Sequence, residues 1–241
     1  MTFSQFAELL KLEGKTLALR RLTQAEVSAV TPVSEGCALR ALHRAMAGET
    51  VTFLPEAIGC KGALSGMGFS DDLPPIPGGY GYFLSYGRGE GFRPGERLKC
   101  CPEVAEEMIH LLPQKMMKGY AALQVKPYTQ EEAAEVALFF VTPDQLSALV
   151  NLFHYRKSTH DSVILSATSG CSSMFRVPYG ELNKESPRAV VGNLDIFSRP
   201  HFDQNLLTFA VPGEDLSQML EDADSCFFLT PQWRHGIAPR L

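Results

Sequence analysis

Apolar positions along the chain recur at helical spacing in some segments and in short strand-like runs in others. Between residues 4 and 12 they follow i, i+3 and i+4 spacing, which predicts an amphipathic helix that ends before Gly14. The same spacing predicts a helix over 37–46, which ends at Gly48. Further helices are predicted over 102–112, 145–154 and 215–222, and strands over 16–22, 51–54, 123–125, 136–141, 163–165, 189–191 and 206–211.

Two segments of the second half resemble each other. FFVTPDQLSALV (139–150) and FAVPGEDLSQML (209–220) align without gaps at a spacing of 70 residues. In each, an apolar strand ends at a proline and a Leu-Ser helix follows an acidic residue. The pattern is typical of any strand-turn-helix unit, and it also fits two related half-units. We therefore expect an α/β (α+β mixed) fold, with a mixed sheet, packed helices and half-units in similar positions.

Length and composition fit a globular protein. The chain has 241 residues, of which 45% are hydrophobic and 20% charged, so it is long enough to bury a substantial core. No Ser/Gly-rich linker divides it, and we expect a single globular domain over 1–241. The formal net charge is −5 and the basic residues are scattered, which argues against a nucleic-acid partner.

The first residues, MTFSQFAELLKLEGK, lack both the basic start and the apolar stretch of a signal peptide. Apolar runs such as 136–141 are far shorter than the roughly 20 residues of a membrane span, so no membrane association is expected. We predict a cytoplasmic protein, in which a reducing compartment keeps the thiols free.

The common nucleotide and hydrolase motifs are absent from the sequence. There is no G-x-x-x-x-G-K-[ST] loop, no dinucleotide fingerprint of glycines after a strand and no G-x-S-x-G elbow. The six histidines form no H-x-x-H pattern, so metal ligation on one helix face is not indicated. The sequence names no reaction and leaves open whether the protein is an enzyme.

The cysteines carry the clearest chemical signal. Six cysteines and 20 glycines in 241 residues predict about 0.5 Gly-Cys pairs by chance (6 × 20/240), yet the chain has three. They are Gly36-Cys37, Gly59-Cys60 and Gly170-Cys171.

Three chemical properties favour one shared site for these thiols. Cys37 and Cys60 stand near predicted helix starts, where amide groups and the helix dipole favour a thiolate. Cys171 follows a strand and lies among glycine and serines. Glycine beside a ligating cysteine lets the main chain approach a metal and donate hydrogen bonds to sulfur. The alternative is that each cysteine is simply a small buried residue. We expect an iron–sulfur cluster or zinc, held by Cys37, Cys60 and Cys171.

The other cysteines and one histidine receive separate interpretations. Cys100 and Cys101 are read as structural or as the source of a further ligand, since adjacent cysteines seldom form a disulfide. Cys226, in the apolar SCFFL, is expected in the core. Three thiolates leave one coordination position of the metal open. His43 lies six residues after Cys37 and is a further candidate for this fourth position, with an ordinary satisfied histidine as the alternative.

Two alternatives need no metal. Four glycines within 59–68 suggest close backbone approach or a tight turn, and an aromatic run follows at 80–86. Together these segments would line a small-molecule pocket, which is the alternative function. A subunit that docks on a partner through an apolar surface is a third interpretation. The sequence also leaves a homo-oligomer open.

The chain resembles the prokaryotic ArCR family, known as domain of unknown function 169. The resemblance rests on CALRALHRAMAGETVTF, IGCKGALSGMGF, VTPDQLSALV, ATSGCSSM and VVGNLDIFSR, from about Cys37 to the C-terminus. It implies no established activity. It does imply an intracellular prokaryotic protein, frequently of anaerobes, with cysteines at the positions of Cys37, Cys60 and Cys171. It also implies that Arg199 pairs with an anionic ligand or a cluster, with a structural salt bridge as the alternative. In the metal-free interpretation, Arg199 would hold an anionic group of the small molecule in the pocket.

Overall fold

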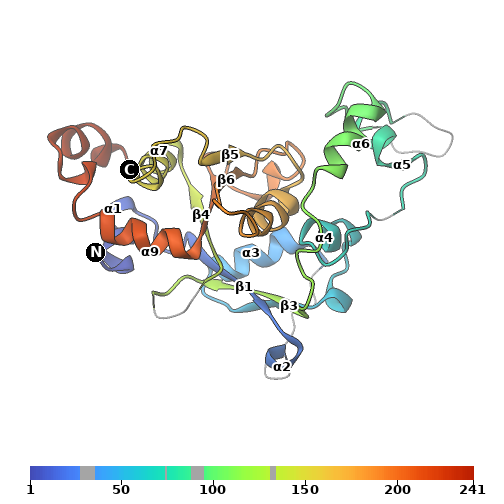
Figure 1. Cartoon of the computed structure of the whole chain (residues 1–241), viewed down its shortest axis with the longest axis horizontal. Coiled ribbons are helices and arrows are strands. Elements are labelled where there is room, and N and C mark those ends of the chain that lie inside the picture. The colour runs from blue at the N-terminus through green and yellow to red at the C-terminus, as the bar shows by residue number, and fades with distance from the viewer. Residues whose placement is uncertain (28–35, 74, 88–94, 131–133) are drawn as a thin grey trace.

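A seven-stranded sheet forms the centre of the molecule, with the strand order β2-β3-β1-β4-β7-β6-β5 (Figure 1). The structure is a computed structural model that describes residues 1–27, 36–73, 75–87, 95–130 and 134–241. The strands are β1 (Thr16–Leu22), β2 (Val51–Phe53), β3 (Ala122–Pro127), β4 (Val136–Val141), β5 (Val163–Leu165), β6 (Ala189–Gly192) and β7 (Leu207–Pro212). The pair β5–β6 is parallel and the other pairs are antiparallel. The mixed α/β fold expected from the sequence is confirmed.

Helices cover both faces of the sheet because the central strands are apolar on both sides. Along β4, Leu138 and Phe140 join the core on one face, whereas Ala137, Phe139 and Val141 join the core on the other. The first core is covered by α3 (Ala38–Met46), α4 (Lys61–Gly66), the π-helical turn η2 (Ser172–Arg176) and α8 (Val177–Glu181). The second is covered by α1 (Phe3–Leu10), α7 (Pro143–Phe153), α9 (Gly213–Asp222) and the C-terminal turns η4 (Phe227–Leu229), η5 (Trp233–Ile237) and η6 (Ala238–Arg240).

The remaining helical segments lie along the connections between these elements. Helix α2 (Gln24–Val27) follows β1, η1 (Pro55–Ala57) follows β2, and η3 (Arg199–His201) lies between β6 and β7. Helices α5 (Gly79–Leu84) and α6 (Pro102–His110) pack against each other and extend from the rest of the molecule (Figure 1). Among the described residues, no helix has both the length and the apolar character required to cross a bilayer.

The two half-units are neighbours in the sheet. Strands β4 and β7 are antiparallel, and Phe139 pairs with Phe209, the residue 70 positions later with which it aligns in sequence. Helices α7 and α9 follow these strands and pack against each other on the same face. The expectation of similar positions is therefore confirmed, and the two units are related by an approximate twofold axis between their strands.

Most predicted elements end within two residues of the observed ones, but the Gly-rich segment differs. Two of its glycines, Gly62 and Gly66, lie inside helix α4, where no helix was predicted. The expected close backbone approach is found at Gly66, where an added Cβ atom would lie 2.6 Å from Cβ of Cys171. Glycine in a helix costs roughly 1 kcal/mol relative to alanine, so this short helix depends on tertiary contacts. The aromatic run is likewise helical, as α5.

Candidate thiol site

Each cysteine of the three Gly-Cys pairs stands at the start of a helix. Cys37 is the N-cap residue of α3, Cys60 that of α4 and Cys171 that of η2, and none of them makes a side-chain capping hydrogen bond. All three are free thiols; Cys60 is exposed and the other two are partly buried. The amides and positive dipole at a helix start favour the anionic form of a nearby thiol, so all three positions suit a thiolate.

Close backbone packing brings these helix starts together. A Cβ atom added at Gly66 would lie 2.6 Å from Cβ of Cys171, so α4 contacts the start of η2 at a residue without a side chain. A Cβ atom added at Gly170 would lie 3.5 Å from Cδ1 of Leu39, which is in the first turn of α3. Cys37 and Cys171 also pack against the same hydrophobic core.

The thiols are close enough to influence each other's ionisation. Burial raises the pKa of Cys171 strongly, and the negative charges of Cys37, Cys60 and Asp195 raise it further. Every charged group that shifts this pKa is negative when ionised. The structure thus brings the three predicted thiols into one neighbourhood, where deprotonation accumulates negative charge.

Asp195 was not singled out by the sequence, yet it lies at this site. Its Oδ2 accepts a hydrogen bond of 3.3 Å from the amide of Gly170, and its Oδ1 accepts one of 3.0 Å from the amide of Phe197. Asn193, fully buried with a φ of 57°, turns the chain after β6 toward this loop. Its amide donates to Oγ of Ser173, just after Cys171.

Groups from the α5 region also lie near the thiols. Burial raises the pKa of Tyr80, and the charges of Cys60 and Glu96 raise it further. Burial likewise raises the pKa of Glu96, with a further contribution from Asp195. Tyr80 and Glu96 therefore belong to the surroundings of the thiol site, although they come from a segment that extends away from the sheet.

The glycines of the three pairs are not equivalent. Gly170 is buried, and a Cβ atom there would lie 2.6 Å from Cβ of Ser198, so this position requires glycine. Gly36 is exposed with open space around it, and Gly59 is exposed. Close packing against protein atoms is therefore shown for Gly170 and for Gly66, and the role of Gly36 and Gly59 beside a bound metal stays a prediction.

The candidates for a fourth coordination position have partners of their own. His43 bonds the carbonyl of His201 at 2.6 Å through Nε2 and stacks on the Phe202 ring at 5.0 Å, as an ordinary satisfied histidine does. The sulfurs of Cys100 and Cys101 are 4.0 Å apart on the approach to α6. Cys226 is buried in the second core, as expected.

The guanidinium of Arg199, for which an anionic partner is implied by the resemblance, donates hydrogen bonds to the backbone carbonyls of Gln204 and Leu206. Its role toward a ligand stays a prediction. Throughout the described ranges, no group of three or more His, Cys, Asp or Glu side chains is compact enough to hold a metal ion.

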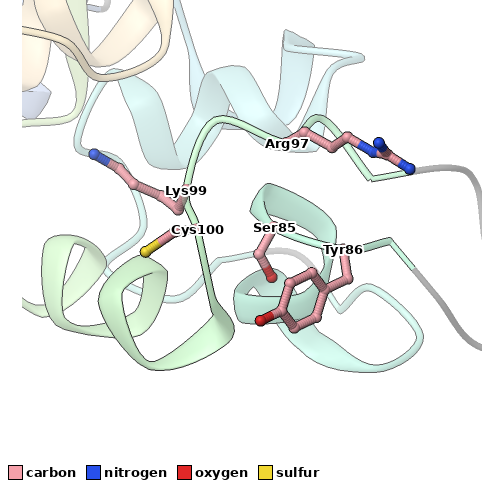
Figure 2. A pocket seen from close by; sticks show the side chains of 5 residues that line it. All are labelled: Ser85, Tyr86, Arg97, Lys99 and Cys100. Carbon is pink, nitrogen blue, oxygen red and sulfur yellow. The ribbon is translucent and has the colours of Figure 1, made fainter.

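The structure has a pocket of about 460 Å³ between the end of α5 and the segment before α6. Figure 2 shows its described lining, which consists of Ser85, Tyr86, Arg97, Lys99 and Cys100. It overlaps the aromatic run expected to line a ligand site, but neither the Gly-rich segment nor Arg199 is among these residues. Exposed apolar side chains also gather in this region: Tyr82, Tyr86, Leu98, Val104 and Leu111.

Comparison with known proteins identifies the family without an activity. No curated protein matches the chain, and no solved structure does. A family model described as uncharacterised ArCR, domain of unknown function 169, matches residues 5–222. This range contains the whole sheet and all three Gly-Cys pairs. The chain belongs to the ArCR family.

Proposed function

We propose that Cys37, Cys60 and Cys171 hold an iron–sulfur cluster. The observation that carries the proposal is the gathering of three free thiols at three helix starts, packed through Gly66 and Gly170. Three unrelated buried cysteines would have no reason to share either feature. A π-helical turn directly after Cys171 adds support, because such turns occur frequently at functional sites.

The donor set consists of three thiols, the ligand type that holds iron–sulfur clusters. The groups that act on Cys171 are all negative when ionised, so a bound cation would relieve their mutual repulsion and replace the protons. One tetrahedral zinc needs sulfurs about 3.8 Å apart. A cluster accepts thiolates spread over a wider distance, since each binds a different iron.

The protein would contribute three thiolates, a structured backbone and a partly open face. A bound cluster would supply one-electron transfer, or an iron that no protein thiolate occupies. Exposed Cys60 leaves that side accessible to a partner or small molecule. Asp195 keeps the Gly170 amide engaged at 3.3 Å and so orders the backbone before Cys171. The proposal includes a reducing cytoplasmic location, where the thiols remain free.

Anaerobic reconstitution tests the proposal. The full chain, reduced and incubated with ferrous iron and sulfide, should acquire both elements in equal amounts and a broad visible absorption. Cys37→Ala, Cys60→Ala and Cys171→Ala should each reduce the bound iron severely. Cys226→Ala, the same substitution at a thiol buried in the second core, should leave it unchanged.

Two results would refute the cluster. One is a fully reduced protein that takes up neither iron nor sulfide. The other is uptake that is the same in wild type and Cys171→Ala. In either case the metal-free alternative, a small-molecule binding domain, would become the better interpretation.

A further inference from the structure

Two further thiols form a close pair, and neither is among the groups that shift the pKa of Cys171. Sγ of Cys100 is 4.0 Å from Sγ of Cys101, and neither cysteine is buried. Adjacent side chains on an extended chain point to opposite sides, but here the backbone bends at 99–101, just before Pro102 begins α6. The separation is close to the roughly 3.8 Å between two thiolates on one tetrahedral ion.

Backbone contacts hold the walls of the adjoining pocket in place. The amide of Lys99 donates to the Leu84 carbonyl at 2.9 Å, and the amide of Glu96 donates to the Phe83 carbonyl at 2.7 Å. Helix α5 also packs closely on α6, since a Cβ atom at Gly81 would lie 3.0 Å from the Pro102 carbonyl oxygen. The dithiol therefore lies at the edge of a formed space of about 460 Å³.

This space has an aromatic wall and a positive rim. In Figure 2, Ser85 and Tyr86 lie across from Cys100, while the Arg97 and Lys99 side chains point away from each other. Among the described residues, neither cation has an ion-pair partner. Separated positive charges would attract an anionic molecule larger than one ion.

We propose that Cys100 and Cys101 form a binding site for a thiophilic metal ion that arrives as the complex of a small anionic thiol. The ion binds through ligand exchange without a redox change. Each new metal–sulfur bond to a cysteine replaces a metal–sulfur bond to the carrier, and the cysteine proton passes to the released carrier thiolate. The pocket volume accommodates the carrier while it is still bound, and Arg97 and Lys99 attract its carboxylates.

The site is tested with Cd²⁺ supplied as its mercaptoacetate complex to the reduced full chain under anaerobic conditions. The thiolate-to-metal absorption should show that wild type binds one more equivalent of Cd²⁺ per chain than the Cys100→Ser/Cys101→Ser variant does. Cys37→Ala/Cys60→Ala/Cys171→Ala should retain that equivalent, which makes this inference independent of the proposed cluster. Equal Cd²⁺ stoichiometry in wild type and the Cys100→Ser/Cys101→Ser variant would overturn the site.

The requirement for an anionic carrier is tested by supplying Cd²⁺ as the complex of either of two small thiols, one anionic and one neutral. Arg97→Gln/Lys99→Gln should slow uptake from the mercaptoacetate complex roughly tenfold and leave uptake from the neutral mercaptoethanol complex unchanged. Equal rates for the variant and wild type with both carriers would overturn the anionic carrier. Circular dichroism melting checks that these substitutions leave the fold intact.

Discussion

The guanidinium of Arg176 donates hydrogen bonds to both the backbone carbonyl and the side-chain hydroxyl of Ser65, at 3.1 and 3.0 Å. Arg176 is the last residue of η2, which Cys171 precedes, and Ser65 lies in α4, which Cys60 precedes. Nε of Arg176 also donates to the Pro113 carbonyl. A single buried side chain thus fixes the two helices that carry two of the thiols.

Replacement of this arginine should weaken both the fold and the site. We expect Arg176→Met to lower the free energy of unfolding by about 3 kcal/mol, because buried carbonyl and hydroxyl groups lose their donors. Urea denaturation measures the change. Arg40→Met, the same substitution at an exposed residue of α3, should change stability by at most about 0.5 kcal/mol. Similar losses in both variants would contradict the role given to Arg176.

Two glycines of α4 offer a matched pair of substitutions. Gly66→Ala should destabilise the protein by about 1–3 kcal/mol, because the new Cβ would lie 2.6 Å from Cβ of Cys171. Gly62→Ala places its Cβ 3.7 Å from Sγ of Cys60, an ordinary contact. Its gain in helix propensity should stabilise the protein by about 0.5–1 kcal/mol. The melting temperature should therefore fall in Gly66→Ala and rise in Gly62→Ala. A stabilising Gly66→Ala would show that α4 and η2 do not touch.

The raised pKa of Cys171 predicts a pH dependence for the reduced, metal-free protein. The folded state keeps this thiol protonated, mainly through burial, whereas the unfolded state releases the proton above about pH 8.5. The contribution to stability is therefore fully present below that pH and is lost as pH rises toward the folded pKa, by up to about 1.4 kcal/mol per pH unit.

Denaturation at a series of alkaline pH values measures this slope. Cys171→Ala should make the slope shallower, whereas Cys100→Ser should retain it. An identical slope in Cys171→Ala and wild type would mean that this thiol ionises as freely in the folded protein as in the unfolded chain.

Substitutions of Arg21 and of the adjacent Arg20 should differ in their effect on stability, because the two side chains have different surroundings. The guanidinium of Arg21 lies 4.5 Å from the ring centroid of Tyr120 and 4.6 Å from that of Tyr179, and Nε and Nη2 donate to Glu135 at 3.1 and 2.7 Å. We expect Arg21→Lys to cost about 1–3 kcal/mol in urea denaturation, because lysine cannot reproduce the planar, bidentate contacts.

The neighbouring residue provides the control. Arg20 contacts Glu26 in an exposed ion pair, and such pairs contribute little to stability. Arg20→Lys should therefore change the free energy of unfolding by less than about 0.5 kcal/mol. If the two variants lose equal stability, the stacking around Arg21 contributes nothing of its own.

Much of the fold could be predicted because apolar residues recur along the chain at the spacing of helices or in short strand-like runs. Strands 16–22, 136–141 and 163–165 were predicted with their observed limits, since each is a short apolar run between turn residues. The helix α4 could not be predicted in this way. Local propensity penalises its glycines, and only the distant contact of Gly66 with Cys171 makes the missing side chain useful.

The site was predictable only in part. The helix starts and Gly-Cys pairs pointed to Cys37, Cys60 and Cys171, which do lie in one neighbourhood. Asp195 and Arg176 were missed, because their partners, Gly170 and Ser65, are far away in the sequence and no motif links them. The DIFS segment after Gly192 offered one weak signal, since an acidic residue in a turn after a strand often bonds nearby amides.

The strand order also governs how this chain can fold. Strand β1 is synthesised well before its two neighbours in the sheet, since Leu17 pairs with Pro127 on one side and with Leu138 on the other. Long loops must close before these pairings stabilise the sheet, which makes folding slow. Until β3 and β4 have emerged from the ribosome, β1 has two unpaired edges, and an unpaired strand edge is prone to aggregate.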